Sequence, residues 1–184
     1  SGVWYRGQEA RQFCEGLIAR GLHKKGCYFG CNTRFAYLDE QTIKLMGQAN
    51  FRFVLLGLEA CDDETLTRLN KGYKVEDVRQ NLEWFTKYGL HPHLTIMVGY
   101  YWQTQEQLDQ TVRTVRELMF QGLARTLQVT ICTPLDFTPY HRECLDQGVL
   151  LTDDYDDFDM SKLIVRTPIP HERFYEAIRQ MYGI

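Results

Sequence analysis

The sequence has little of what marks a membrane protein or a nucleic-acid-binding protein. No apolar run approaches the roughly 18 residues that are needed to cross a bilayer, and the N-terminal region has no apolar core of a signal peptide. The formal charge is −3, and the lysines and arginines form no cluster that would favour phosphate binding. These absences predict a cytoplasmic protein that does not bind nucleic acid.

Cysteine is too sparse for a disulfide scaffold, because six thiols are spread over 184 residues. The only close pair is Cys27 and Cys31, and no third cysteine lies near it. Structural zinc and iron–sulfur sites normally collect three or four ligands. The acidic stretch 153–159 lacks the glycine and the closing glutamate of a calcium loop. We therefore expect reduced cysteines, mostly in the core, and no metal site.

What the sequence does contain is a regular alternation of strand-like and helical segments. Hydrophobic residues make up 44% and charged residues 24%, which are ordinary values for one globular domain of this length. The predicted strands cover residues 26–34, 51–58, 94–99 and 127–132. The predicted helices cover residues 7–22, 39–49, 62–69, 75–88 and 104–122, with a helical turn at 141–147 and a last helix after Pro170. In the first helix the apolar spacing places Ala10, Phe13, Leu17 and Ile18 on the buried face, with Cys14 beside it.

This order predicts an α/β fold with a parallel sheet of about four strands and outer helices. Parallel strands covered on one side curl toward a barrel, but eight strands are needed to close one. The fold class is therefore a partial (β/α) TIM-like barrel. Its domain is predicted to span residues 1–184, with the later βα units followed by a helical extension.

Ligands of parallel α/β sheets gather beyond the carboxyl ends of the strands. The residues that the four predicted strands deliver there are Asn32 and Arg34, Glu59, Gly99 with Tyr100 to Gln103, and Thr133 with Asp136. A guanidinium, a carboxylate and a flat aromatic loop are able to hold a zwitterion, a ribose diol and a purine. Many nucleotides meet this description, and Glu59 on its own is equally well explained as a solvated carboxylate in an ordinary turn.

A family resemblance narrows the choice. The motifs that carry it are Arg34 before an acidic helix start, Gly57-Leu58-Glu59-Ala60, Leu69-Asn70-Lys71-Gly72-Tyr73, Ile96-Met97-Val98-Gly99 and residues 133–140. In this order, over residues 5–182, they resemble the radical S-adenosylmethionine (SAM) superfamily after its first strands. Residues 148–160 are similar to the cobalamin-associated branch that includes the anaerobic magnesium-protoporphyrin IX monomethyl ester oxidative cyclases.

The resemblance implies SAM as a cofactor and a small-molecule substrate, and it assigns roles to single residues. Arg34 and Lys71 would meet the SAM carboxylate or substrate anions, and Glu59 would hydrogen-bond the ribose or the amino group. The backbone near Gly99 would pack on the adenine, with Tyr100 and Thr133 as further contacts. For Arg34 and Lys71 the alternative is surface solvation, and for the glycines it is close packing.

Two departures from the family pattern stand out. Residues 100–104 replace a proline–glycine turn that ends in glutamate, and residues 135–138 replace a proline–glycine–threonine. The family's Cys-x3-Cys-x2-Cys motif is absent, so the [4Fe–4S] cluster and cobalamin are implied for a full-length parent and the cluster is not expected in this chain. The alternative is a non-catalytic α/β module that binds a nucleotide or a partner. Dimerisation through an open sheet edge is a further prediction.

Overall fold

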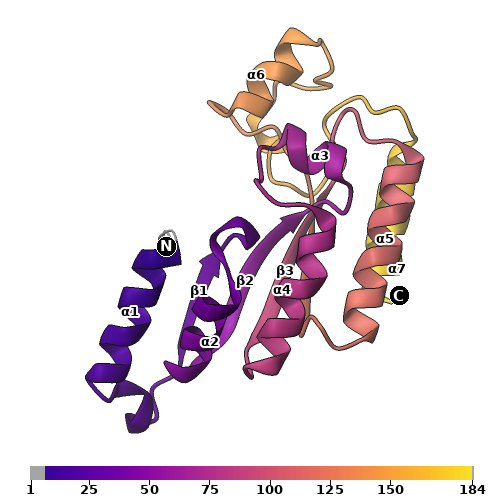
Figure 1. Ribbon diagram of the computed structural model, residues 1–184. Helices are drawn as coiled ribbons and strands as arrows, with labels where there is room; N and C mark the ends of the chain where they lie inside the picture. Colours follow the sequence, from indigo (N-terminus) through magenta and orange to yellow (C-terminus); the bar gives the residue numbers. More distant parts are fainter. Residues whose placement is uncertain (1–6, 184) are drawn as a thin grey trace.

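The computed structural model describes residues 7–183, so the domain predicted over residues 1–184 extends beyond the described part at both ends. Four parallel strands form one sheet in the order β1-β2-β3-β4. The strands are β1 (Phe29–Thr33), β2 (Phe51–Glu59), β3 (His91–Val98) and β4 (Thr126–Ile131). Since consecutive strands are neighbours and helices connect them, the predicted α/β class and partial barrel are confirmed (Figure 1).

The helices follow the predicted alternation. The α-helices are α1 (Gly7–Ala19), α2 (Glu40–Gln48), α3 (Asp63–Arg68), α4 (Val75–Lys87), α5 (Gln105–Phe120), α6 (Pro139–Asp146) and α7 (His171–Tyr182). Three 3-10 turns, η1 (Leu22–Lys25), η2 (Phe35–Tyr37) and η3 (Tyr155–Asp157), complete the described elements. None of the described helices is long and apolar enough to cross a membrane.

Helix starts are encoded by local side chains. Asp39 precedes α2 and its carboxylate accepts the Thr42 N–H at 2.8 Å, while Asp62 does the same for Thr65 at the start of α3. Thr104 begins α5 as one half of a capping box. The three capping residues stand at the first positions of helices that the sequence predicted, at residues 39, 62 and 104.

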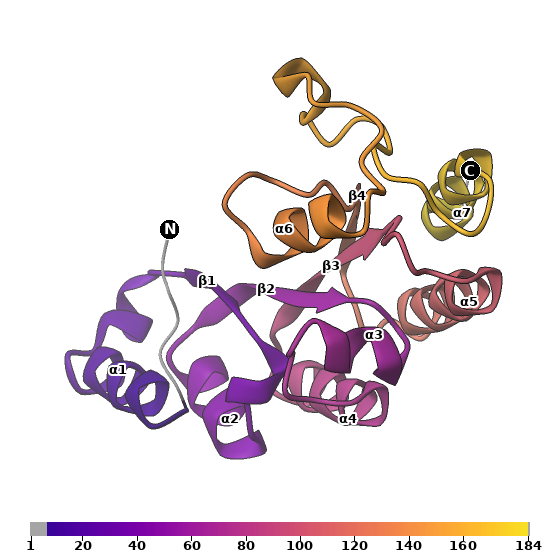
Figure 2. The same cartoon turned by 90° about the horizontal axis from the view of Figure 1, so that it is seen from above.

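The long helices cover one face of the sheet. In β2 beyond Arg52 and in β3, the even-numbered residues, among them Leu56 and Leu94, are buried under the helices. The odd-numbered residues face the other side, where Phe53 is 47% exposed and its ring lies 5.4 Å from that of His93. Seen from above, α1, α2, α4 and α5 follow one side of the sheet, and α6 lies on the other (Figure 2). The uncovered face and its carboxyl rim are therefore the open surfaces of the half-barrel.

Three details differ from the predictions. Phe13 was predicted to face the core, but it is 48% exposed and Cys14 is fully buried. The reason is that Ala10, Cys14 and Leu17 form the stripe that packs inward, and position 13 is rotated by about 100° from position 14. The first helix also ends at Ala19 and not at residue 22, where the separate turn η1 begins.

The third strand begins at His91, three residues earlier than predicted, and it includes Pro92. A proline has no N–H for a ladder and is confined to special positions in sheets. The Pro92 carbonyl accepts the Arg125 N–H at 2.9 Å, so the backbone of Pro92 faces the β4 side just before the pairing of His93 with Thr126. No β2–β3 hydrogen bond is lost there.

Candidate functional site

Strand β2 ends in a bulge that fixes the direction of Glu59. The pairing with β3 slips between Gly57 and Glu59, and Glu59 adopts a left-handed φ of 64°. A left-handed backbone is uncommon for a residue other than glycine and is held there by its surroundings. The Glu59 Oε1 lies 2.9 Å from the Nζ of Lys71, and both side chains are more than four-fifths buried. Glu59 and Lys71 were both predicted as residues of one site. The structure brings them together, and they form an ion pair.

Tyr73 supports this ion pair from the following turn. Its hydroxyl lies 2.8 Å from the Leu58 carbonyl oxygen and 3.0 Å from that of Gly57, so it is hydrogen-bonded to the bulge itself. Burial, followed by the negative charge of Glu59, raises the pKa of Tyr73 well above its usual range. The phenol therefore stays protonated, and the turn that carries Lys71 is attached to the end of β2.

Arg34 lies on the same part of the rim, directly after β1. Its side chain is exposed, and its positive charge acts on Tyr73 in the direction opposite to that of Glu59. The next residue, Phe35, packs its ring 5.2 Å from that of Tyr73. Arg34 is thus a solvent-facing cation near Tyr73, whose hydroxyl is hydrogen-bonded to the bulge that leads to Glu59.

Gly99 and Tyr100, in the turn after β3, are buried, in contrast to the exposed Arg34. Gly99 has a φ of 91°, and its N–H donates to the Oε1 of Gln103 at 2.8 Å. A Cβ at this position would lie 2.5 Å from the Cδ1 of Leu163, so the glycine allows the C-terminal segment to approach closely. This geometry accounts for the glycine by close packing, and the adenine contact inferred from the resemblance stays a prediction.

Tyr100 and Thr133 place buried polar atoms beneath the rim. Tyr100 is 1% exposed, and neither its hydroxyl nor the Thr133 Oγ1 has a hydrogen-bond partner within residues 7–183. Burial raises the pKa of Tyr100 well above its usual range, with further contributions from Cys132 and Glu59. Buried polar groups are normally hydrogen-bonded, so these two atoms are places where a water or a ligand atom would be stabilising.

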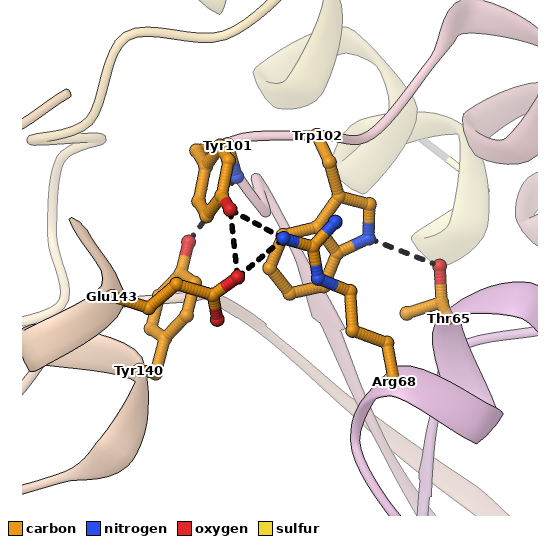
Figure 3. Close-up of polar contacts among 6 residues, drawn as sticks. All are labelled: Thr65, Arg68, Tyr101, Trp102, Tyr140 and Glu143. Atoms are coloured by element: carbon orange, nitrogen blue, oxygen red, sulfur yellow. Dashed lines mark hydrogen bonds and ion pairs between the residues drawn. The ribbon is translucent and has the colours of Figure 1, made fainter. Parts of the chain in front are cut away.

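An aromatic and ionic network at this rim was not predicted from the sequence (Figure 3). Arg68 donates to the Glu143 carboxylate and to the Tyr101 hydroxyl, and its guanidinium lies 3.8 Å from the ring centre of Trp102. The Tyr101 hydroxyl donates to Glu143 at 2.7 Å, and the Tyr101 N–H donates to the Tyr140 hydroxyl at 3.2 Å. The tyrosine and tryptophan run after β3 was the available sequence signal, but its partners come from α3 and α6.

The cysteines do not fit an iron–sulfur cluster. Five of the six are buried, as predicted, and Cys27 is exposed while Cys31 is buried in β1. Burial, followed by an interaction with Cys14, raises the pKa of the Cys31 thiol to about 12, whereas cluster ligands are thiolates. Within residues 7–183, no three histidine, cysteine or acidic side chains gather as a metal site would need.

Comparison with protein families assigns the chain to a family. The family model described as the radical SAM superfamily matches residues 7–115, which is more than half of the chain. The chain belongs to the radical SAM superfamily. The resemblance that the sequence motifs suggested is confirmed, and this superfamily is defined by the use of SAM with a [4Fe–4S] cluster.

Two curated relatives carry the same name. The anaerobic magnesium-protoporphyrin IX monomethyl ester cyclase of Cereibacter sphaeroides is 29% identical over 160 residues, covering 86% of this chain and 24% of the relative. The protein of that name from Rubrivivax gelatinosus is 26% identical, covering 88% of this chain and 33% of the relative. This radical SAM chain therefore spans about a quarter to a third of the length of these relatives.

Among solved structures, the fold is similar to that of the radical SAM methyltransferase TsrM from Kitasatospora setae. The TM-score is 0.68 at 14% identity, covering 94% of this chain and 39% of TsrM. That structure contains cobalamin and a [4Fe–4S] cluster. At this identity the likeness concerns the fold alone, and it agrees with a radical SAM partial barrel.

Proposed function

We propose that this chain supplies SAM and substrate contacts in a radical SAM oxidoreductase of the magnesium-protoporphyrin monomethyl ester cyclase type. The superfamily match supports SAM as the cofactor. The two relatives named as cyclases support a porphyrin ester as the substrate. The similarity of residues 148–160 to the cobalamin-associated branch supports cobalamin as a further cofactor of the larger protein.

The observation that carries this proposal is the Glu59–Lys71 ion pair at the carboxyl rim. SAM presents an ammonium, a carboxylate and a ribose diol, which need an acceptor and cations at close range. Glu59 would accept from the ribose or the ammonium, and Lys71 with the exposed Arg34 would meet the carboxylate. Tyr100, next to Gly99 in the turn after β3, and Thr133, after β4, supply polar atoms that lack hydrogen-bond partners within the described residues. This donor set fits SAM.

The described residues do not fit the cluster, so no electron-transfer step is assigned to them. The chain by itself is accordingly expected to leave SAM intact. The test is anaerobic reconstitution of the chain with iron, sulfide, a reductant and SAM, followed by measurement of methionine and 5′-deoxyadenosine. Formation of 5′-deoxyadenosine above the level of a protein-free control would contradict the proposal.

Glu59→Gln tests the SAM contact directly. In the longer protein that carries this chain with its cluster, we expect the SAM dissociation constant, measured by calorimetry, to rise about 10-fold to 100-fold, since a hydrogen bond to a charged group contributes about 1.5–3 kcal/mol. Glu83→Gln is the matched control, because Glu83 is an exposed carboxylate on α4. An unchanged SAM affinity in Glu59→Gln would mean that Glu59 has a structural role and does not contact SAM.

Gly57→Ala offers a second route to the same contact. A Cβ at Gly57 would lie 2.6 Å from the Glu59 Oε1, which is the movable end of a side chain, and the φ of Gly57 is not positive. We expect the carboxylate to be displaced and the SAM affinity to fall. Full SAM affinity in this variant would refute the assignment of Glu59.

We also propose that the chain self-associates through the outer edge of β1. At the other edge the Val129 N–H donates to the Tyr182 hydroxyl at 2.9 Å, so α7 occupies part of the β4 edge. Unpaired strand edges are the sites at which chains pair. Light scattering of the chain should give a dimer that Asn32→Pro, on β1, converts to a monomer; a dimer unaffected by this change would exclude the β1 edge.

A further inference from the structure

Arg68, the last residue of α3, is held by side chains from two other segments. Its guanidinium lies 3.8 Å from the ring centre of Trp102 and 5.0 Å from that of Tyr101, and it forms an ion pair with Glu143. Trp102 in turn directs its Nε1–H to the Thr65 Oγ1 at 3.5 Å. Tyr101, Trp102 and Glu143 thus surround the guanidinium of Arg68 (Figure 3).

These segments are the loops that follow three consecutive strands. Arg68 lies on α3 after β2, Tyr101 and Trp102 lie in the turn after β3, and Glu143 lies on α6 after β4. Figure 1 shows α3 and α6 together beyond the carboxyl ends of the strands. The guanidinium of Arg68 thus links the segments that follow β2, β3 and β4 at this part of the rim.

Helix α6 has few other attachments. Within its eight residues, all of which are described, Cys144 is the one buried side chain. The ring of Tyr140 lies against those of Tyr100, Tyr101 and Trp102, and Glu143 pairs with Arg68. His141 also lies 3.3 Å from Asp136 and contacts the ring of Phe158. Since so little apolar surface holds the helix, its position depends on this polar and aromatic network to an unusual degree.

We propose that Arg68 is a positioning residue that holds the three loops after β2, β3 and β4 in one arrangement and so orders the rim for SAM. Tyr100 is the neighbour of Tyr101, and Thr133 begins the loop that leads to α6. Release of the network would therefore move two of the groups assigned to the cofactor. The inference rests on the proposed function for its ligand, but the arrangement of the loops is tested without SAM.

The first experiment measures hydrogen exchange in this chain. Arg68→Met keeps the length of the side chain and removes the charge and the hydrogen bonds. We expect the amides of α6 to exchange about 5-fold to 30-fold faster, as the loss of an exposed ion pair and a cation–π contact implies, while α4 is unchanged. Unchanged exchange in α6 would overturn the proposal.

The matched control is Arg79→Met. Arg79 lies on α4, where its guanidinium is 3.7 Å from the Glu117 carboxylate and also bonds to Gln121. This variant removes an arginine and an ion pair of similar exposure at a place remote from α6, so α6 should keep its native exchange rate. Equal acceleration of α6 in both variants would mean that Arg68 acts only through general stability and would refute its positioning role.

The second experiment measures SAM affinity in the longer protein. Arg68→Met should raise the SAM dissociation constant at least 5-fold, and Arg68→Lys should restore part of this loss, because lysine keeps the charge opposite Glu143 but not the planar fork. If α6 is released and SAM affinity is unchanged, the positioning role for SAM is wrong. The SAM affinity of Glu59→Gln tests the proposed function separately, because this substitution changes the site and leaves the contacts of α6 intact.

Discussion

Gly99→Ala is the substitution whose effect the structure defines most closely. The residue has a φ of 91°, and an added Cβ would lie 2.5 Å from the Leu163 Cδ1, well inside any contact that real Cβ atoms show. The N–H that donates to Gln103 is retained in alanine. The change therefore adds two costs, a left-handed backbone and an overpacked contact, and removes no hydrogen bond.

The magnitude follows from these two costs. A left-handed conformation costs an L-residue about 1–2 kcal/mol, and overpacking costs about 1–3 kcal/mol. Gly122→Ala is the matched control, because Gly122 has a φ of 69° but nothing lies within 4 Å of its added Cβ. We expect the free energy of unfolding to fall by about 1–2 kcal/mol in Gly122→Ala and by about 2–5 kcal/mol in Gly99→Ala.

Urea denaturation followed by circular dichroism measures both losses, provided that the dependence on urea concentration is the same in each variant. A double-mutant cycle with Leu163→Ala isolates the contact, and the clash predicts that the second change costs at least 1 kcal/mol less in the Gly99→Ala background. Equal losses in Gly99→Ala and Gly122→Ala, together with no coupling to Leu163, would refute the docking of the C-terminal segment on the turn after β3.

Two further predictions concern the helices. Gly47→Ala should destabilise the protein by about 1 kcal/mol in the same denaturation assay although alanine favours helices, because its Cβ would lie 2.6 Å from the Tyr88 carbonyl oxygen; a gain in stability would contradict this packing of α2 on α4. Burial pushes the pKa of Glu143 upward, but hydrogen bonds from Arg68 and Tyr101 outweigh it and leave the pKa below its ordinary value of 4.5. Its stabilising contribution is therefore complete above pH 4.5 and is lost as the pH falls through the lower folded-state pKa. The difference in melting temperature between the native protein and Glu143→Gln should shrink as the pH falls below 4.5, and a difference that stays constant until acid unfolds the protein would contradict this.

The fold was largely predictable because its signals are local. Caps such as Asp39 and Thr104 act over three residues, and strands buried on one side are short apolar runs between turns. The predictions were wrong where the burial of a side chain depends on packing against a distant part of the chain. The burial of Cys14 in place of Phe13 depends on how α1 lies against the rest of the molecule, which the helical spacing leaves open by one position.

The site was predictable only in outline. The rule that parallel strands deliver their ligands at one edge placed Arg34, Glu59, Gly99, Tyr100 and Thr133 at the same rim, and the structure has them there. The rule says nothing about partners. A carboxylate and a lysine twelve positions apart form an ion pair here because a bulge and a turn aim both side chains inward.

The sequence by itself determined the order of strands and helices, the residues at the strand ends and the kinship with radical SAM proteins, because each of these is written in short stretches of chain. Only the tertiary structure decided that Glu59 faces Lys71 and that Leu163 fills the space beside Gly99. It also decided that Arg68 meets Glu143, 75 positions away, across the rings of the turn after β3. The physical reason is that such contacts depend on how the loops of separate strands converge above one edge of the sheet.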